Sequence, residues 1–237
     1  MNDSAIVCVV DDDESVRSAL LRLLKSAGYR GRAFASGQAL LAEPPSDDGP
    51  VVVLTDLRMP GIDGIELAKK LNAYPLPPPI VFLSAHGDVQ VSVRAMKDGA
   101  VDFLEKPVQE EDLFDALERA VARSREQILQ RRGLADLTEN FTKLTRRERQ
   151  VFALVISGLL NKEVAWELGI SEKTIKVHRA RVVEKMGARS LPDLVRMAER
   201  LGIPSSPPDH APALGAAIHL TPAGDSSSTS HPPPRAR

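Results

Sequence analysis

The segment Ile6-Val7-Cys8-Val9-Val10-Asp11-Asp12 joins a short apolar run to a pair of carboxylates. Three later apolar runs end at a polar residue in the same way: residues 51–55 precede Asp56, 80–83 precede Ser84, and 101–105 precede Lys106. Short apolar runs that alternate with helix-period segments are typical of strands in a parallel sheet. The carboxyl ends of parallel strands lie on one edge, where ligands bind. We therefore expect these five polar residues to converge in one pocket.

Three carboxylates in one pocket repel one another. At a separation of about 4 Å and an effective dielectric constant of about 20, one like-charge pair costs roughly 4 kcal/mol. The cluster therefore calls for a cation, and an all-oxygen, carboxylate-rich site favours Mg²⁺. Lys106 adds a positive charge and Ser84 a hydroxyl donor. This combination suits an aspartate that accepts a phosphoryl group.

The segments that carry these residues resemble the receiver domain of two-component response regulators. They are Val10-Asp11-Asp12-Asp13, Leu54-Thr55-Asp56-Leu57-Arg58-Met59-Pro60-Gly61, Leu83-Ser84-Ala85-His86-Gly87-Asp88 and Asp102-Phe103-Leu104-Glu105-Lys106-Pro107. The resemblance implies a flavodoxin-like fold, which is an α/β doubly wound parallel sheet of five strands. By the same resemblance Asp56 is the phosphoacceptor, and Asp11 and Asp12 hold Mg²⁺ with it. The backbone carbonyl of Arg58 is a further implied metal ligand.

The resemblance also implies a conformational switch. Ser84 and Phe103 match the hydroxyl and aromatic switch positions, and phosphorylation is expected to reorient them. That change would reshape the surface around residues 89–99 and favour a homodimer. The implied phosphoryl donor is a sensor histidine kinase, so the protein is expected to be a phosphoacceptor with at most autophosphatase activity and not an enzyme of metabolism.

Two other functions use similar residues. Phosphatases of the haloacid-dehalogenase type also combine an aspartate nucleophile, Mg²⁺ and a lysine, but they place a second aspartate two residues after the first, where this chain has Arg58. A phosphorylation-independent DNA-binding regulator with a degenerate receiver is the second alternative. The presence of all five pocket residues disfavours it.

Charge is distributed unevenly along the 237 residues. Residues 1–120 contain 20 acidic and 12 basic side chains, whereas residues 145–203 contain 7 acidic and 12 basic ones. An acidic, metal-binding half joined to a basic half suggests signal input coupled to nucleic-acid output. The single cysteine, Cys8, excludes a disulfide framework. With neither a signal-peptide pattern nor an apolar stretch of about 18 residues, we expect a cytoplasmic protein without a membrane span.

The predicted organisation has four parts: a receiver over 1–122, a helical linker over 123–143, a helix-turn-helix domain over 144–203, and a disordered Pro/Ser-rich tail over 204–237. Within the receiver, helices are expected at about 15–27, 64–71, 89–97 and from 110 into the 120s. Asp13 is either a solvated turn residue or the cap of the first of these helices. A coiled coil through the linker (Val121, Ile128, Leu134, Leu137) is a less favoured alternative.

The sequence from Leu144 predicts a small all-α domain of four capped helices. Thr145 followed by Glu148 is a capping-box pattern that begins the first helix. Later starts and glycine ends are predicted at Asn161 and Gly169, at Ser171 and Gly187, and at Ser190. Two short helices joined through residues 168–171 are typical of a helix-turn-helix, whose second helix enters the DNA major groove.

The segment 172–186 has an apolar side and a basic side. At about 100° per residue, the inward set is Ile175, Val182, Val183 and Met186. The outward set is Lys173, Lys176, Val177, Ala180 and Arg181, which offers groups able to reach phosphates, guanine or thymine methyls. A merely solvated basic face is the alternative, and the capped helix-turn-helix around the segment disfavours it.

This region resembles the LuxR-type DNA-binding domain, and within it the FixJ subgroup. The resemblance is carried by Asn161-Lys162-Glu163-Val164-Ala165, Ser171-Glu172-Lys173-Thr174-Ile175-Lys176-Val177-His178-Arg179 and Ser190-Leu191-Pro192-Asp193-Leu194. We predict DNA contacts from Asn161, Lys162, Lys173, Thr174, Lys176, Val177, Ala180 and Arg181. Taken together, the two domains resemble a response regulator of the FixJ/NarL type, with promoter DNA and RNA polymerase as expected partners.

Two residues depart from the pattern of the family. Arg179 falls on the inward side of its helix, where relatives often have leucine, and Arg181 stands where asparagine is common. We expect Arg179 either to reach a phosphate or to pair with an acidic neighbour, with the structural role favoured. Arg181 suggests an operator preference that differs from that of relatives.

Overall fold

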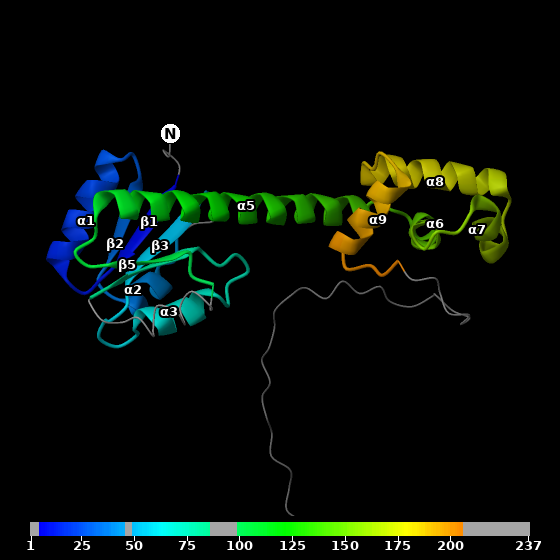
Figure 1. Ribbon diagram of the computed structural model, residues 1–237. Helices are drawn as coiled ribbons and strands as arrows, with labels where there is room; N and C mark the ends of the chain where they lie inside the picture. Colours follow the sequence, from blue (N-terminus) through cyan, green and yellow to red (C-terminus); the bar gives the residue numbers. More distant parts are fainter. Residues whose placement is uncertain (1–4, 46–48, 86–98, 206–237) are drawn as a thin grey trace, which may run out of the picture.

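The computed structural model describes residues 5–45, 49–85 and 99–205. In these residues an N-terminal α/β unit is followed by a helical unit, and the long helix α5 (Glu110–Thr142) contributes to both (Figure 1). Among the described helices, none combines the length and apolar character needed to span a bilayer. The predicted helix over 89–97 and nearly all of the predicted tail lie outside the described residues.

The N-terminal unit is built on five parallel strands in the order β2-β1-β3-β4-β5. Their bounds are Ile6–Val10 (β1), Arg30–Phe34 (β2), Val51–Asp56 (β3), Ile80–Ser84 (β4) and Asp102–Glu105 (β5). Because the strand order reverses at β1, the crevice at the carboxyl ends of β1 and β3 is the expected ligand site. The predicted five-stranded, doubly wound fold is confirmed.

Both faces of the sheet are buried, which explains why its strands are almost continuously apolar. Alternate residues, among them Val7, Val9 and Leu54, pack in one core with α1 (Glu14–Ser26) and α5. The residues between them, such as Cys8 and Phe82, pack in a second core with α2 (Gly37–Ala42) and α3 (Gly64–Leu71). Figure 1 shows these helix pairs on opposite sides of the sheet.

The strand that no apolar run revealed is β2. Its sequence, Arg30-Gly31-Arg32-Ala33-Phe34, has one buried side chain, Phe34, because the strand lies at the edge of the sheet. The Arg32 guanidinium lies 5.0 Å from the centre of the Phe34 ring and 2.8 Å from the Glu43 carboxylate. An edge strand covered by charged side chains carries no hydrophobic periodicity for the sequence to display.

Three of the expected helix starts in the receiver lie in the described residues, and these agree with the structure within one residue. Asp13 caps α1 by accepting a hydrogen bond from the Ser15 amide at 2.8 Å, so the cap interpretation of Asp13 is confirmed. Asp63 caps α3 by accepting from the Glu66 amide at 2.7 Å.

Helix α5 is continuous over 33 residues and enters two cores. Near its start, Leu113 and Leu117 pack against the sheet, and the Ser124 hydroxyl accepts a hydrogen bond from the Val51 amide at 3.1 Å. Near its end, Leu137 and Phe141 belong to the core of the C-terminal unit. The residues predicted to form a linker are therefore helical, and the last of them are part of the folded unit that follows.

Four further helices complete the C-terminal unit: α6 (Arg146–Ile156), α7 (Asn161–Leu168), α8 (Glu172–Met186) and α9 (Leu191–Arg200). The capping box of Thr145 and Glu148 is present, and Ser171 and Ser190 cap their helices as expected. Gly169 and Gly187 end α7 and α8 in the left-handed conformation, with φ of 63° and 69°.

The predicted cap at Asn161 is wrong. Leu160 is the N-cap of α7, and Asn161 is the first helical residue. The Leu160 amide donates to the Glu163 carboxylate at 2.7 Å, while the Asn161 side chain accepts a hydrogen bond from Arg179. A tertiary contact has therefore taken the oxygen that a cap would use.

An ion pair joins the start of α6 to the end of α8. Lys185 Nζ lies 2.7 Å from Oε2 of Glu148, whose side chain is 3% exposed and which also accepts from the Thr145 amide at 2.8 Å. Lys185 donates in addition to the Lys143 carbonyl at the end of α5. The lysine and these hydrogen bonds hold the pKa of Glu148 down at about 2.

We predict that this ion pair makes the C-terminal unit sensitive to acid. Because its folded pKa is depressed, Glu148 contributes stability above about pH 4.5, and the contribution is lost as the pH falls toward 2. Glu148→Gln should lower the free energy of unfolding at pH 7 by about 1–3 kcal/mol. Its deficit relative to the wild type should shrink in acid, as measured by denaturant unfolding followed by circular dichroism. Glu199→Gln, at an exposed position of α9, is the control, and a deficit independent of pH would contradict the assignment.

Candidate functional site

Three carboxylates gather at the crevice where the strand order reverses. Asp11 and Asp12 follow β1, Asp56 ends β3, and one carboxylate oxygen from each lies within 4.8 Å of the others. Asp11 is buried, Asp56 is partly buried and Asp12 is exposed. The predicted convergence of these three side chains is therefore observed.

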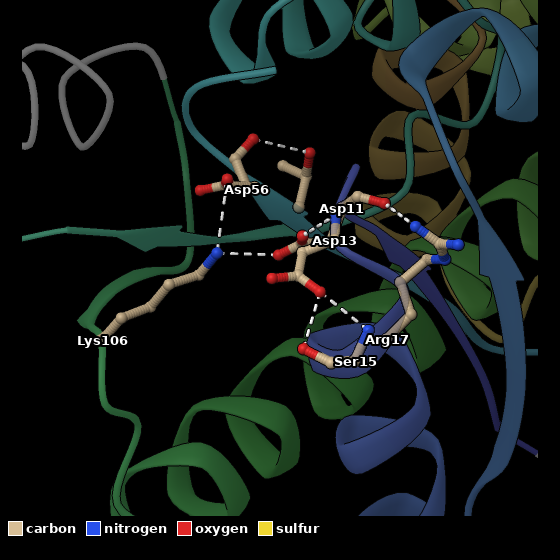
Figure 2. A network of polar contacts seen from close by, with 7 residues as sticks. Asp11, Asp13, Ser15, Arg17, Asp56 and Lys106 are labelled. Carbon is tan, nitrogen blue, oxygen red and sulfur yellow. Dashed lines mark hydrogen bonds and ion pairs between the residues drawn. The ribbon is translucent and has the colours of Figure 1, made fainter. Parts of the chain in front are cut away.

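Lys106 bridges the two less exposed carboxylates. Its ammonium donates to Asp11 Oδ2 at 2.7 Å and lies 3.3 Å from Asp56 Oδ2, as Figure 2 shows. The lysine directly follows β5, and the Lys106–Pro107 peptide bond is cis. Residues from three strand ends, up to 95 positions apart in the chain, thus form one charged cluster.

The backbone around Asp11 is held from the start of α1. Asp11 Oδ1 accepts a hydrogen bond from the Asp13 amide at 2.9 Å, and the Asp11 carbonyl accepts from Arg17 at 2.7 Å (Figure 2). The Asp13 carboxylate accepts hydrogen bonds from the amide and the hydroxyl of Ser15 at the start of α1. Asp13 therefore positions the loop, while Asp11 turns its other oxygen toward Lys106.

The pKa values of the central pair reflect their burial and their mutual charge. Burial raises the pKa of Asp56, and Asp11 raises it further, against the opposing charge of Lys106. Burial acts to lower the pKa of Lys106, but the hydrogen bonds and charges of Asp11 and Asp56 raise it overall. The ammonium is therefore held in its charged form beside the carboxylates.

The donor set fits a divalent cation. All three ligand atoms are carboxylate oxygens, which hard ions such as Mg²⁺ prefer. Three carboxylates and one ammonium leave two uncompensated negative charges when every group is ionised, so one divalent ion would balance the cluster. The pocket could therefore hold such a metal. Arg58 is the second residue of the loop after Asp56 and has an exposed side chain, and the role of its carbonyl stays a prediction.

The two predicted switch residues lie beside the cluster, on neighbouring strands. Ser84 ends β4, is 1% exposed, and donates a hydrogen bond from its hydroxyl to the Ala85 carbonyl at 3.0 Å. Phe103 in β5 is half-buried, with its ring centroid 6.4 Å from that of Phe82. To bind a phosphoryl group, the Ser84 hydroxyl would have to give up its hydrogen bond to the Ala85 carbonyl and donate to a phosphoryl oxygen instead.

Sequence reasoning missed the contribution of Gly64. A Cβ atom at this position would lie 2.5 Å from the Asp56 carbonyl oxygen and 3.1 Å from the Leu57 Cα. The Gly64 amide also donates to the Leu57 carbonyl at 3.0 Å. Only glycine lets the start of α3 approach the backbone of Asp56 this closely. The adjacent helix cap, Asp63, was the available signal in the sequence.

A second candidate site is the exposed side of α8 with the start of α7. Of the residues predicted to contact DNA, Asn161 is half-buried, and the others are exposed: Lys162, Lys173, Thr174, Lys176, Val177, Ala180 and Arg181. On the other side, Ile175, Val182 and Met186 are buried and Val183 is half-buried. The two-sided helix expected from periodicity is therefore observed. Lys176 lies 3.5 Å from Glu172 on the same face.

Arg179 points inward, as its position on the helix predicted. It is half-buried and donates to Asn161 Oδ1 at 2.9 Å. The partner is an amide of α7 and not the acidic residue that was considered. The structural role is thus the one observed in the free protein.

Comparison with known proteins matches both units. Residues 7–118 match the response regulator receiver domain, and residues 142–198 match the luxR family of bacterial regulatory proteins. Nodulation protein W of Bradyrhizobium diazoefficiens is 45% identical over 84% of this chain and 87% of its own length. Transcriptional regulatory protein FixJ of Azorhizobium caulinodans is 44% identical over 89% of this chain and 99% of its own.

A solved structure extends this similarity to three dimensions. The response regulator StyR superposes with a TM-score of 0.72 at 43% identity, covering 83% of this chain and 99% of that one. These relatives share both units in the same order with this chain. It belongs to the two-component response regulators of the FixJ type, in which a receiver domain precedes a LuxR-type DNA-binding domain.

Proposed function

We propose that the protein is a transcription regulator that a sensor histidine kinase switches on by phosphorylating Asp56. The observation that carries the proposal is the partly buried Asp56 carboxylate, 3.3 Å from the Lys106 ammonium and within a carboxylate cluster suited to a divalent metal. A nucleophile, a fixed positive charge and a metal-binding set are the parts that phosphoryl transfer to aspartate requires.

In the proposed reaction, an Asp56 oxygen attacks the phosphorus of a phosphohistidine on the kinase. The new P–O bond forms as the P–N bond breaks, and the electron pair of the broken bond stays with the histidine ring. Lys106 stabilises the charge on the phosphoryl oxygens. Bound Mg²⁺, with Asp11, Asp12, Asp56 and the Arg58 carbonyl as its proposed ligands, would add charge neutralisation. Slow hydrolysis of the acyl phosphate resets the protein, without turnover of a metabolite.

The phosphoryl group is proposed to act through Lys106, Ser84 and Phe103. A phosphoryl group adds oxygens that compete with Asp11 for the Lys106 ammonium and offer a new acceptor to the Ser84 hydroxyl. Movement of Ser84 frees space beside β5, so that Phe103 can reorient. The altered surface then favours a homodimer.

The dimer is proposed to read promoter DNA with α8. At the promoter it is also proposed to contact RNA polymerase. The support is the exposed basic face of α8 within a helix-turn-helix that is capped at both ends. The proposed contacts are Asn161, Lys162, Lys173, Thr174, Lys176, Val177, Ala180 and Arg181. Because promoter DNA is the proposed target, we expect the protein to act in the cytoplasm.

Phosphorylation is expected at one position and to depend on metal. With acetyl phosphate and Mg²⁺, the wild type should gain one acid-stable, base-labile acyl phosphate, detected by intact-protein mass spectrometry. Asp56→Asn should gain none, and a chelator should abolish the reaction of the wild type. Exposed Asp115→Asn is the matched control. A phosphate mapped to serine or histidine would overturn the assignment of Asp56.

Lys106 is expected to couple the phosphoryl group to dimerisation. Lys106→Ala should still bind Mg²⁺, since the carboxylate oxygens remain, yet should stay monomeric after treatment with phosphodonor. Light scattering during size-exclusion chromatography measures the mass, and Lys69→Ala, an exposed lysine on α3, is the control. If Lys106→Ala dimerises on phosphorylation as the wild type does, Lys106 is not the switch partner.

The DNA face gives a prediction about base reading. A twofold dimer should bind two inverted half-sites about one helical turn, or roughly 10 base pairs, apart. Lys176→Ala should cost about 1–3 kcal/mol and relax the preference at one base position, if the lysine reaches a base edge. Binding to single-base variants of a duplex selected by the wild type measures this, with Lys25→Ala in α1 as the control. A uniform loss over all duplexes would instead assign Lys176 to a phosphate.

A further inference from the structure

Arg179 connects the two helices of the helix-turn-helix motif. It lies in α8, is half-buried, and donates a hydrogen bond from Nη1 to Asn161 Oδ1 at 2.9 Å. Asn161 is the first residue of α7, 18 positions earlier in the chain. The bond therefore ties the start of α7 to the middle of α8.

The same bond fixes the orientation of the Asn161 carboxamide. A carboxamide has an acceptor oxygen and a donor NH₂ group, whereas a guanidinium only donates. The oxygen must therefore face Arg179, because the reverse orientation would set donors against donors. The Nδ2 group lies on the other side of the carboxamide, and no described residue accepts a hydrogen bond from it.

This orientation decides what Asn161 can recognise. Reading adenine with an asparagine takes both ends of the carboxamide, one as donor and one as acceptor. With its oxygen directed toward the Arg179 guanidinium, Asn161 turns the NH₂ end away from Arg179, and a donor presented in this way suits a phosphate oxygen. The exposed ammonium of Lys162, the next residue, would strengthen binding of the same backbone.

We propose that Arg179 is a positioning residue for DNA binding, which holds the Asn161 carboxamide with its NH₂ group available to a DNA phosphate. The inference rests on the proposed reading of DNA by α8 and adds a residue that acts through another. An arginine suits the role because its guanidinium stays charged when half-buried and its planar donors fix direction. A leucine in its place would fill space and leave the carboxamide free to rotate.

The test uses the full-length protein, a duplex that the wild type enriches from a random library, and a scrambled duplex. Arg179→Leu and Asn161→Ala should each weaken binding to both duplexes by about fivefold to tenfold. The double variant should bind no worse than either single one, and Arg179→Lys should recover part of the loss. The salt dependence of binding should stay close to that of the wild type in both single variants, because a neutral asparagine releases no counterion and Arg179 does not itself touch the phosphate. Arg22→Leu on α1 removes the same charge at a distance and should bind as the wild type does.

A further variant separates an effect on DNA binding from an effect on folding. Asn161→Asp retains the partner of Arg179, so its thermal unfolding by circular dichroism should match the wild type. Its affinity should fall further than that of Asn161→Ala, because a carboxylate oxygen now faces the phosphate.

Three outcomes would overturn the inference. Additive losses in the double variant would mean that Arg179 contacts DNA itself, and lower melting with unchanged affinity would leave it a structural tie. A loss confined to one base position would mean that Asn161 reads a base. If the wild type enriches no sequence at all, the DNA-reading function fails as well.

Discussion

The phosphoryl site depends on the ion pairs that the Lys106 ammonium makes with Asp11 and Asp56. Asp11 is 1% exposed, and a buried carboxylate without a partner would be strongly destabilising. The ammonium compensates Asp11 at 2.7 Å and Asp56 at 3.3 Å, and thereby ties the ends of β1, β3 and β5 together. Since the balance is local, a cation that enters the cluster or a phosphoryl group of about two negative charges changes it directly. Lys106 has the only long, flexible side chain among these charged groups. It is therefore the group best able to move when the charge of the cluster changes.

Helix α5 determines how such a change can reach the DNA-binding unit. It contributes Leu113 and Leu117 to the core over the sheet and Leu137 and Phe141 to the core of the second unit. The carbonyls at its end are bound by cations of the second unit, with Arg149 donating to Thr142 and Lys185 to Lys143. The two cores are therefore joined by helix from residue 110 to 142 and not by a loop.

The sequence reveals those features of the fold and site that depend on local pattern. Asp11, Asp56 and Lys106 could be placed together because each lies at the carboxyl end of a strand, and parallel strands share one edge. The edge strand β2 was not predicted, because charged side chains cover it and it lacks the alternation of apolar and polar residues that a half-buried strand shows. Asn161 has the residue type of a helix cap, yet its oxygen bonds to Arg179 on another helix, and such a tertiary partner leaves no local trace. The need for glycine at position 64 is explained only by the fold, because a Cβ atom there would lie 2.5 Å from the Asp56 carbonyl oxygen, and spacing along the chain does not encode this proximity.

The length of α5 between the two cores limits how strongly charge in the receiver can act on the DNA-binding unit. Between Ser124, the last residue of α5 bonded to the sheet, and Leu137, the first in the second core, the helix rises about 20 Å at roughly 1.5 Å per residue. The screening length in physiological salt is about 8 Å. The negative charge of the acidic receiver, and any phosphoryl charge added to it, is thus largely screened at the far end of α5. Simple repulsion between the receiver and DNA is therefore too weak to control binding. Under the proposed function, phosphorylation would therefore act through contacts, by changing a surface that a second copy recognises, because two output domains held together bind DNA more tightly than one without any change in their own structure.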